Sequence, residues 1–224
     1  MRIAEIFYSI QGEGRLIGVP SVFIRTSGCN LRCVWCDTPY TSWKPQGEER
    51  SVDEILAEVK SHPAKHAVVT GGEPLLAPEI EALTRALKRK GFHITIETAA
   101  TIFKSVECDL VSLSPKLSNS TPEGKFAGMH EEHRINAPVI QQYIDRYEYQ
   151  LKFVADKKAD FAEIEEILAK LNNVDRARVL VMPQGSTKDE LRERAPWIVE
   201  MCKERGFAYT PRLQIELWGN RRGT

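Results

Sequence analysis

The sequence predicts an α/β fold in which parallel strands form an incomplete barrel. Apolar runs of strand length alternate along the chain with amphipathic segments of helix length, which is the pattern of repeated β–α units. Only roughly 150–170 residues fall in such units, fewer than the roughly 250 of a closed eight-fold barrel. Right-handed crossovers would bring the C-terminal ends of the strands to one rim, and we expect the functional groups there.

The individual elements follow from local patterns. Residues 93–97 (HITIE), for example, alternate apolar and polar side chains as a half-buried strand does. Strands are expected at 21–26, 67–70, 93–97, 109–113, 149–154, 177–182 and 208–217. Helices are expected at 52–60, 78–90, 133–146, 160–171 and 188–205. Gly91 and Gly206 are stop signals, Pro138 interrupts one helix, and a kink is expected at Pro196.

Two long stretches, 30–50 and 115–132, lack a regular pattern. The second is rich in Ser, Asn, Pro and Gly, which predicts a loop that is mobile or ordered by a ligand. The N-terminal residues 6–14 are expected to precede the first strand. We therefore expect a single domain over residues 1–224, with a cysteine-containing loop at 29–50 and a C-terminal extension at 208–224.

Composition and charge exclude several classes of protein. Hydrophobic residues make up 42% and charged residues 28% of the chain, the balance of a globular protein. Lys plus Arg number 31, as do Asp plus Glu, so there is no dominant basic tail for nucleic acid. The two arginines at 221–222 are too few to form a nucleic-acid-binding surface in a chain without net charge. The apolar runs, such as 179–182, are far shorter than the roughly 20 residues of a membrane span. The start of the chain does not resemble a signal peptide, so we expect a cytoplasmic protein without membrane or nucleic-acid partners.

Three of the five cysteines form a C-x3-C-x2-C motif: Cys29, Cys33 and Cys36. A four-iron cluster usually takes four thiolates, so a loop that offers three leaves one iron open to a small molecule. A structural zinc site would need a fourth ligand, and Cys108, His62 and His66 are distant in sequence without paired spacing. The cysteines could also be small buried hydrophobic residues, which is the interpretation we give to Cys108 and Cys202.

Further motifs follow expected strands, and each taken alone could be an ordinary turn. The first is Thr70-Gly71-Gly72-Glu73-Pro74, whose glycines allow a ligand close to the backbone and whose Glu73 could accept from an ammonium group. Ser114-Pro115-Lys116 could hold ribose or carboxylate oxygens, and Met182-Pro183-Gln184-Gly185 could place Gln184 at an adenine edge. Glu97 lies at the same rim and could bind ribose hydroxyls. Gln150 and Lys152 lie on one strand, but alternation does not fix which way they point.

The N-terminal motif Ile10-Gln11-Gly12-Glu13-Gly14 adds polar groups of another kind. Gln11 and Glu13 offer the paired donors and acceptors that a purine-like edge needs. Arg25 offers a bidentate fork for a carboxylate. Asp37-Thr38 follows the last cysteine of the motif, and the Thr38 hydroxyl can serve as an oxygen ligand for Mg²⁺.

Together these motifs resemble two nested families. The cysteine spacing is the signature of the radical S-adenosylmethionine (SAM) superfamily, which implies a [4Fe-4S] cluster, reductive cleavage of SAM and a deoxyadenosyl radical. The stretches FYSIQGEG, FIRTSGCNLRCVWCDT, TGGEP and SPK, with RLQ and WGNRRG near the C-terminus, are similar to the 7-carboxy-7-deazaguanine synthase family over nearly the whole chain. That resemblance implies conversion of 6-carboxy-5,6,7,8-tetrahydropterin to 7-carboxy-7-deazaguanine with loss of ammonia, in queuosine and related deazapurine biosynthesis. It also implies a (β6/α3) partial barrel and a homodimer.

The same resemblance assigns roles to matching residues. Substrate binding falls to the N-terminal motif and two strand ends: Ile10, Gln11, Gly12, Glu13, Arg25 and Thr70. Cofactor contacts fall to Trp35, Cys36, Asp37, Gly72, Glu73, Ser114, Pro115, Lys116, Met182, Pro183, Gln184 and Gly185. The metal ligands are Cys29, Cys33 and Cys36 for the cluster and Thr38 for Mg²⁺, and an electron donor such as a flavodoxin or ferredoxin is implied. Some family members place a C-terminal carboxylate near the substrate, and the sequence does not say whether residues 220–224 do so.

Two other interpretations stay open at this point. One is another radical SAM enzyme, such as an activating enzyme that generates a glycyl radical on a partner protein, although Gln11, Glu13 and Thr38 argue against it. The other is an iron–sulfur carrier or a zinc-binding module, although a carrier would want four cysteines around a closed cluster.

Overall fold

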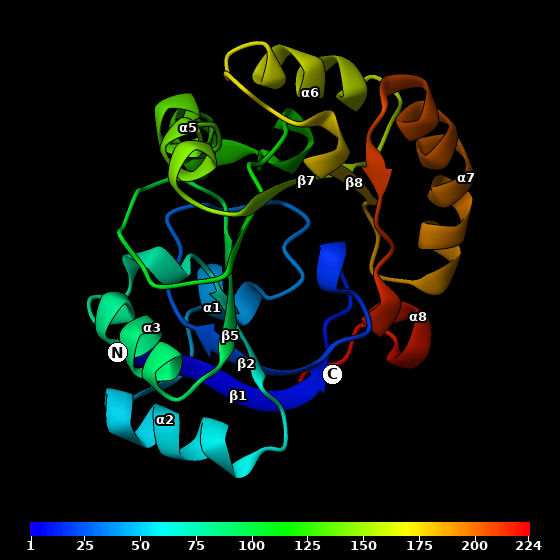
Figure 1. Ribbon diagram of the computed structural model, residues 1–224. Coiled ribbons are helices and arrows are strands. Elements are labelled where there is room, and N and C mark those ends of the chain that lie inside the picture. Colours follow the sequence, from blue (N-terminus) through cyan, green and yellow to red (C-terminus); the bar gives the residue numbers. More distant parts are fainter.

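A computed structural model describes residues 1–224, in which one twisted sheet forms the centre of the molecule (Figure 1). The nine strands are ordered β3-β1-β2-β4-β5-β6-β7-β8-β9. Their bounds are β1 Arg2–Ile10, β2 Pro20–Thr26, β3 Glu48–Glu49, β4 His66–Gly71, β5 His93–Thr98, β6 Leu110–Leu113, β7 Tyr149–Ala155, β8 Val179–Pro183 and β9 Ala208–Tyr209. In this order, the neighbouring strands from β2 through β4 to β9 all pair in parallel. At the other edge of the sheet, β1 pairs antiparallel with both β2 and β3.

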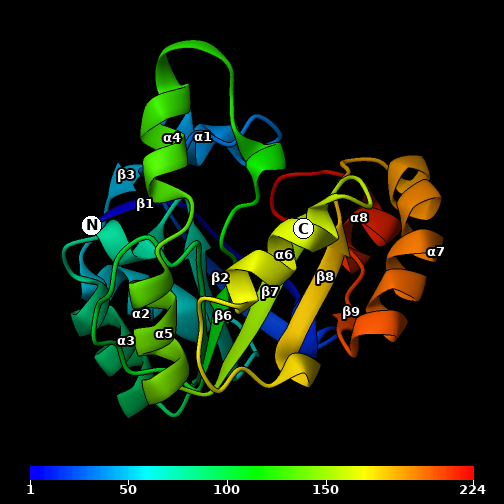
Figure 2. The same ribbon diagram turned by 90° about the horizontal axis from the view of Figure 1, so that it is seen from above.

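The longer helices lie around the outside of the curved sheet, and the two edges of the sheet are not joined (Figures 1 and 2). Their bounds are α1 Pro39–Ser42, α2 Val52–Ser61, α3 Ile80–Arg89, α4 Ala127–His133, α5 Ala137–Arg146, α6 Asp160–Leu168, α7 Lys188–Arg205 and α8 Leu213–Trp218. The predicted α/β fold with an incomplete barrel is therefore confirmed. The parallel strands β2, β4, β5, β6, β7 and β8 supply the six strands of the (β6/α3) pattern.

Local sequence explains where several helices begin and end. Ser51 and Thr187 each form a capping box with the glutamate three residues later, at the starts of α2 and α7. Gly206 ends α7 in the left-handed conformation, with φ of 69°, as its position in the sequence predicts. The helix continues across Pro196. These signals fix the lengths of the helices that cover the sheet.

The core lies between the sheet and these helices. Every residue of β7 is buried, and the neighbouring parallel strands β4, β5, β6 and β8 are buried almost throughout, as expected for strands covered on both faces. Fully buried Ile24, Ile94, Ile96 and Phe153 belong to the same large apolar cluster as residues of the outer helices, such as Leu83 of α3. No helix in the chain has both the length and the apolar character required to cross a bilayer.

The N- and C-terminal regions differ from the expectations. Residues 2–10 form β1, the longest strand, although they were expected to precede the first strand. The expected strand at 208–217 is wrong: it is a two-residue strand followed by α8. Pro211 lacks the backbone N–H that a ladder needs, and it separates the two elements.

The expected helix at 133–146 begins later than predicted: α5 starts at Ala137, His133 is the last residue of α4, and Pro138 does not interrupt the helix. Asn136 caps α5 by accepting from the Val139 amide at 3.3 Å, and Pro138 lies in the first turn, where a missing N–H costs nothing. The stretch 115–132 is shaped by short 3₁₀ helices at Ser118–Ser120 and Gly124–Phe126 before α4 begins. The stretch 30–50 contains only α1 and β3, in agreement with its irregular pattern.

Candidate active site

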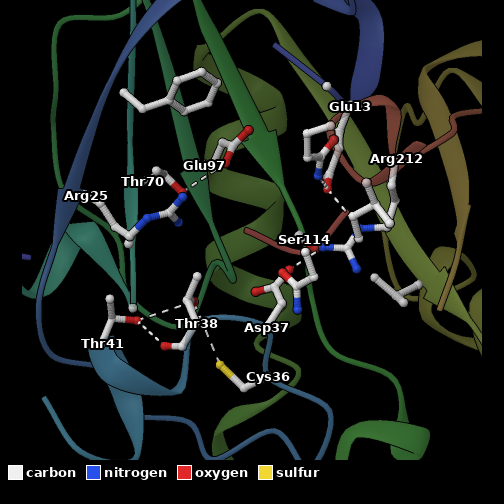
Figure 3. Close-up of a pocket in the computed structure, with 18 of the residues that line it drawn as sticks. Glu13, Arg25, Cys36, Asp37, Thr38, Thr41, Thr70, Glu97, Ser114 and Arg212 are labelled. Atoms are coloured by element: carbon white, nitrogen blue, oxygen red, sulfur yellow. Dashed lines mark hydrogen bonds and ion pairs between the residues drawn. The ribbon is translucent and has the colours of Figure 1, made fainter. Parts of the chain in front are cut away.

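A cavity of about 460 Å³ opens at the C-terminal ends of the parallel strands, where the fold predicted functional groups (Figure 3). Most of the predicted site residues line it: Ile10, Gln11, Gly12, Glu13, Arg25, Cys29, Cys33, Trp35, Cys36, Asp37, Thr38, Thr70, Gly72, Ser114, Lys116, Met182 and Gln184. Four predicted residues do not line it: Glu73, Pro115, Pro183 and Gly185. Residues from the first 13 and the last 13 positions complete its wall.

The three motif cysteines are free thiols on one side of this cavity. Burial raises the pKa of Cys29 to about 12, and nearby Glu73 and the other two thiols add to the effect. Burial likewise raises the pKa of Cys33 to about 11, and the opposing charge of Lys116 does not offset it. Thiols in such surroundings stay protonated unless a metal binds them.

The arrangement of the thiols suits several metal ions better than one. Zinc needs its four ligands around a single point. No group of three or more His, Cys, Asp or Glu side chains in the structure converges on a single point in that way. A four-iron cluster takes each thiolate on a different iron, so its thiolates do not need to converge on one point, and the three thiols that line the cavity match that requirement.

A buried histidine fastens the cysteine loop from outside the cavity. The Arg32 amide donates to Nδ1 of His130 at 3.1 Å. Nε2 of His130 donates to the Ser120 hydroxyl at 2.9 Å, because that hydroxyl already donates to the Leu117 carbonyl at 2.6 Å. Burial lowers the pKa of His130, which keeps the ring neutral and able to accept. No sequence pattern singled out this contact, because 98 residues separate its partners.

Two more hydrogen bonds connect the same loop to the segment before α4. The Val34 amide donates to the Ser120 carbonyl at 2.8 Å. The Trp35 indole donates to the Asn119 carbonyl at 2.9 Å. The stretch that was expected to be a mobile or ligand-ordered loop is therefore the outer support of the cysteine motif.

The glycine-rich motif after β4 packs directly against the cysteine loop. A Cβ on Gly72 would lie 2.1 Å from the Gly28 carbonyl oxygen, so no larger residue fits without a shift. Gly71 has φ of 139°, a conformation that favours glycine. The close approach brings Gly72 into the cavity wall beside Cys29.

The carboxylate of Glu73, in this motif, already has hydrogen-bond donors within the chain. Its carboxylate accepts from the Thr98 hydroxyl at 2.7 Å and from the Ala99 amide at 2.8 Å. Burial raises the pKa of Glu73, and these hydrogen bonds offset part of the rise. The side chain joins the ends of β4 and β5, and its assignment as an acceptor for a cofactor ammonium stays a prediction.

On the opposite side of the cavity, Glu13 is the centre of a buried charge network. It pairs with Lys152 and accepts from Arg212 at 3.2 Å and from Gln214 at 2.8 Å. Burial alone would raise the pKa of Glu13, but the charges of Lys152 and Arg212 outweigh it and lower that pKa to about 2. Lys152 therefore points into the cavity, a direction that the sequence did not determine. Gln150, two residues earlier on the same strand, does not line the cavity and donates to the Ser112 hydroxyl at 2.8 Å.

Arg25 is held at one edge only. Its Nε donates to Glu5 at 2.7 Å, and its guanidinium lies 5.5 Å from the centre of the Phe7 ring. Its two terminal nitrogens make no hydrogen bond within the chain, which leaves them free for a ligand. Glu5 also accepts from Tyr40 at 2.7 Å and from Arg222 at 3.0 Å, a role that the sequence did not indicate.

Glu97 lies between these two groups, as Figure 3 shows. It accepts from Thr70 at 2.9 Å and from Gln11 at 3.1 Å. Gln11 in turn accepts from the Glu13 amide at 3.1 Å, so its side chain is oriented at both ends. The cavity thus presents a fixed row of amide, hydroxyl and carboxylate groups, suited to the polar edge of a heterocycle.

The remaining predicted ligands lie near the cysteines. The Thr38 hydroxyl is 3.9 Å from Sγ of Cys36 and 3.4 Å from the Thr41 hydroxyl, which places two neutral oxygens together. Lys116 folds back onto Ser114, donating to its hydroxyl at 3.1 Å. Met182 and Gln184 reach the wall from the end of β8.

The sequence and the fold are both similar to known proteins. Residues 23–198 match the family model of the radical SAM superfamily. The chain is 48% identical to a 7-carboxy-7-deazaguanine synthase from Rhodopirellula baltica, over 99% of this chain and 88% of that one. It is 44% identical to a protein of the same name from Halobacterium salinarum, over 97% and 90%. The fold is similar to a crystal structure of QueE from Escherichia coli, with a TM-score of 0.70 and 26% identity over 95% of this chain and 93% of that one.

Proposed function

The chain belongs to the 7-carboxy-7-deazaguanine synthase family of the radical SAM superfamily, and we propose on that ground that it converts 6-carboxy-5,6,7,8-tetrahydropterin to 7-carboxy-7-deazaguanine, with release of ammonia. The resemblance inferred from the motifs is thereby confirmed. One observation carries the proposal for the reaction. The three thiols of the cysteine motif and a guanidinium with free terminal nitrogens line the same cavity.

The radical SAM family implies an iron–sulfur cluster and SAM, and we propose that this chain holds them on the cysteine side of the cavity. Together, the cluster and SAM supply an electron and a deoxyadenosyl radical. Cys29, Cys33 and Cys36 would bind three irons of the cluster. SAM would be surrounded by residues that line the cavity: Trp35, Asp37, Gly72, Ser114, Lys116, Met182 and Gln184. The other four residues that the family resemblance assigns to the cofactor do not line the cavity and would support this lining: Glu73, Pro115, Pro183 and Gly185.

We propose that the substrate lies on the opposite side. Arg25 would bind its carboxylate through the free terminal nitrogens, since Glu5 already fixes Nε. Gln11, Thr70 and the backbone from Ile10 to Gly12 would bind the polar edge of the ring, with Glu13 holding the loop in place. Fixed donors and acceptors suit a radical rearrangement, because a loosely held radical would react with solvent or protein.

Thr38 is our candidate for the Mg²⁺ ligand. Mg²⁺ prefers oxygen and keeps several waters or substrate oxygens in its shell, so the Thr38 hydroxyl would supply one ligand and substrate oxygens and waters the rest. The neighbouring Thr41 hydroxyl donates to the Thr38 carbonyl at 2.9 Å and holds the turn in place. The ion would orient the substrate and take no part in electron transfer.

The wider setting of the enzyme is proposed on the same family resemblance. We propose one radical SAM domain over residues 1–224, a cytoplasmic location, a homodimer, and electron donation by a flavodoxin or ferredoxin. The product would enter the biosynthesis of queuosine and related 7-deazapurines. Neither a membrane nor a nucleic acid is needed for this chemistry.

An anaerobic assay tests the reaction directly. The protein is reconstituted with iron and sulfide, reduced, and given SAM, the carboxytetrahydropterin and Mg²⁺; deoxyadenosine and product are followed by chromatography with mass detection. We expect 7-carboxy-7-deazaguanine in the complete mixture and a slower reaction when Mg²⁺ is omitted.

Two variants provide the matched comparison. Cys33→Ala should abolish both products, while Cys108→Ala, whose thiol lies outside the cavity, should retain them. Deoxyadenosine without 7-carboxy-7-deazaguanine would contradict the substrate and favour another radical SAM enzyme. A folded protein that binds no iron would contradict the cluster assignment.

A further inference from the structure

We infer that Arg212 is a positioning residue that couples SAM binding to substrate binding. The inference rests on the proposed function, because it takes the cysteine side of the cavity as the SAM site and the Glu13 side as the substrate site. No role was assigned to Arg212 from the sequence, where it appears only as the first residue of the RLQ motif.

The guanidinium of Arg212 is bonded to three separate segments of the chain. Nη1 donates to the Gly185 carbonyl at 2.6 Å, Nε donates to Glu13 at 3.2 Å, and Nη2 pairs with Asp37. Arg212 is only 8% exposed, and Glu13 and Gly185 are also shielded from solvent, so these three groups depend on one another rather than on water. The Asp37 side chain is 40% exposed and forms the solvent-facing end of the network. Figure 3 shows the side chain lying between Glu13 and Asp37.

Each of the three acceptors belongs to a different part of the proposed site. Asp37 directly follows the last motif cysteine. Gly185 ends the turn that follows β8, which supplies Met182 and Gln184 to the cavity wall. Glu13 belongs to the loop that carries the proposed substrate contacts. A planar guanidinium can donate in three directions at once, whereas an ammonium on a flexible stem cannot reproduce that geometry.

The residues that follow Arg212 pack directly against the loop that carries the proposed substrate contacts. The Leu213 amide donates to the Gly12 carbonyl at 2.9 Å. A Cβ on Gly12 would lie 1.9 Å from Oε1 of Gln214, so the two segments touch with no space between them. Movement of Arg212 therefore moves Gly12 and Glu13 as well. Closure of Asp37 and Gly185 around one ligand would order the loop that binds the other, and the coupling must be reciprocal.

Equilibrium binding measures this coupling without turnover. The dissociation constant of SAM is measured by dialysis on the reconstituted, unreduced protein, with and without the carboxytetrahydropterin. We expect the pterin to tighten SAM binding by about tenfold in the wild-type protein, within the usual range of coupling between sites. In Arg212→Gln the factor should fall below about twofold, and Arg212→Lys should lie between the two. Arg176→Gln, which removes a surface arginine paired with Glu165, should leave the wild-type factor unchanged.

A second measurement uses the chain without cluster or ligand. Hydrogen exchange should become faster in Arg212→Gln at the amides of Gly14 and Leu213, which mark the two sides of the contact, but not in the helix α2. Arg212→Lys provides the same comparison if the glutamine variant does not fold.

The outcomes separate the two hypotheses. A wild-type protein that binds no pterin contradicts the proposed function, and the inference with it. Pterin binding without coupling in the wild-type protein contradicts the inference alone. So does undiminished coupling in a folded Arg212 variant, or unchanged exchange at both amides. Weaker binding of both ligands with the coupling factor intact would indicate a purely structural role for Arg212.

Discussion

The two walls of the cavity balance charge in opposite ways. The substrate wall, formed by Gln11, Glu13, Arg25, Glu97 and Lys152, pairs its charged groups within the chain. Glu13 meets Lys152 and Arg212, and Arg25 meets Glu5. The cysteine wall, residues 29–36, presents three thiols, and burial raises the pKa values of two of them, Cys29 and Cys33. This wall is held by backbone amides and a neutral histidine.

This difference shows what each wall lacks. The substrate wall holds most of its polar groups in fixed positions before a ligand binds, and the terminal nitrogens of Arg25 are the donors that it leaves unpaired. The cysteine wall carries no local cation strong enough to stabilise thiolates, so the iron of the proposed cluster would supply that charge. The first wall is preorganised by the fold, while the second is preorganised only in its backbone. The predictions below test this contrast, from the largest effect to the smallest.

The largest effect is expected where the cysteine wall loses a thiol. Cys29→Ala should lower iron content and visible absorbance after reconstitution, and deoxyadenosine formation should fall on the order of 1,000-fold or more, because the remaining thiols cannot hold the cluster. Its thermal unfolding without metal should remain close to the wild type, since the half-buried thiol makes no charge pair. Full iron content in Cys29→Ala would contradict the conclusion that the cysteine wall needs all three thiols to bind the cluster.

The charge pairs of the substrate wall should make the free energy of unfolding fall in acid. The Glu13 pKa of about 2, against 4.5 in its ordinary state, means that the carboxylate favours the folded state above pH 4.5 and that this contribution is lost as pH falls toward 2. The contribution is about 3 kcal/mol at neutral pH. Urea unfolding of wild type and Glu13→Gln should therefore differ most at pH 7, with the difference shrinking from pH 4.5 downward.

An exposed carboxylate provides the control for this measurement. Glu148 pairs with Arg15 and Arg178 at the surface, where solvent screens the charges. Glu148→Gln should change the free energy of unfolding by no more than about 0.5 kcal/mol at any of these pH values. A Glu13→Gln difference that does not depend on pH would show that the buried pairs do not set the acid stability.

Arg25 tests whether the free guanidinium edge binds the substrate. Arg25→Lys keeps the charge but loses the fork, and kcat/KM for the pterin should fall by about 30-fold, mostly through KM. SAM affinity without substrate should change by less than twofold, because Arg25 lies on the opposite wall. Glu5→Gln should produce a smaller change in the same direction, since it only loosens the guanidinium. Equal losses in SAM and pterin affinity would mean that the two walls are not separate.

The smallest effect is expected outside the cavity, at the support of the cysteine loop. His130→Ala removes the acceptor of the Arg32 amide and should cost about 1–2 kcal/mol of stability. The motif thiols of the metal-free protein should react faster with a thiol reagent, because their loop opens more often. His133→Ala, on the same helix, should leave that rate unchanged, since His133 bonds only the Met129 carbonyl. Equal rates in both variants would show that the loop needs no such support.

Sequence patterns predicted the fold well where the signal is local. Gly91 and Gly206 correctly marked the ends of helices, and the parallel strands lie where apolar runs were recognised. β1 was missed because most residues of Arg2–Ile10 are only half-buried, so the strand lacks the clean alternation of apolar and polar side chains. The last strand was wrong because 208–217 is apolar enough for either state, and only Pro211 hints at the break.

The candidate site was predicted as a set of residues rather than as a set of contacts. Motifs identified most of the residues that line the cavity, but not the partners that hold them. Lys152, Arg212 and Glu13 meet across more than a hundred residues, and nothing in the spacing of a single chain records such a pairing. Glu73 illustrates the converse, because its motif is recognisable while its carboxylate is used by the chain itself.

The contact between Gly12 and Gln214 has a consequence for how the protein is made. Glu13 and Gln214 are 201 residues apart, and Arg222 and Glu5 are 217 apart, so this wall closes the longest loops in the chain. Contacts of such high sequence separation form late and slowly. During synthesis the parallel strands up to β8 can pair before residues 208–224 leave the ribosome. Until the end of the chain docks, Asp37 beside the cysteine motif has no contact with Arg212, so the proposed cluster site is open on that side while the chain is being made.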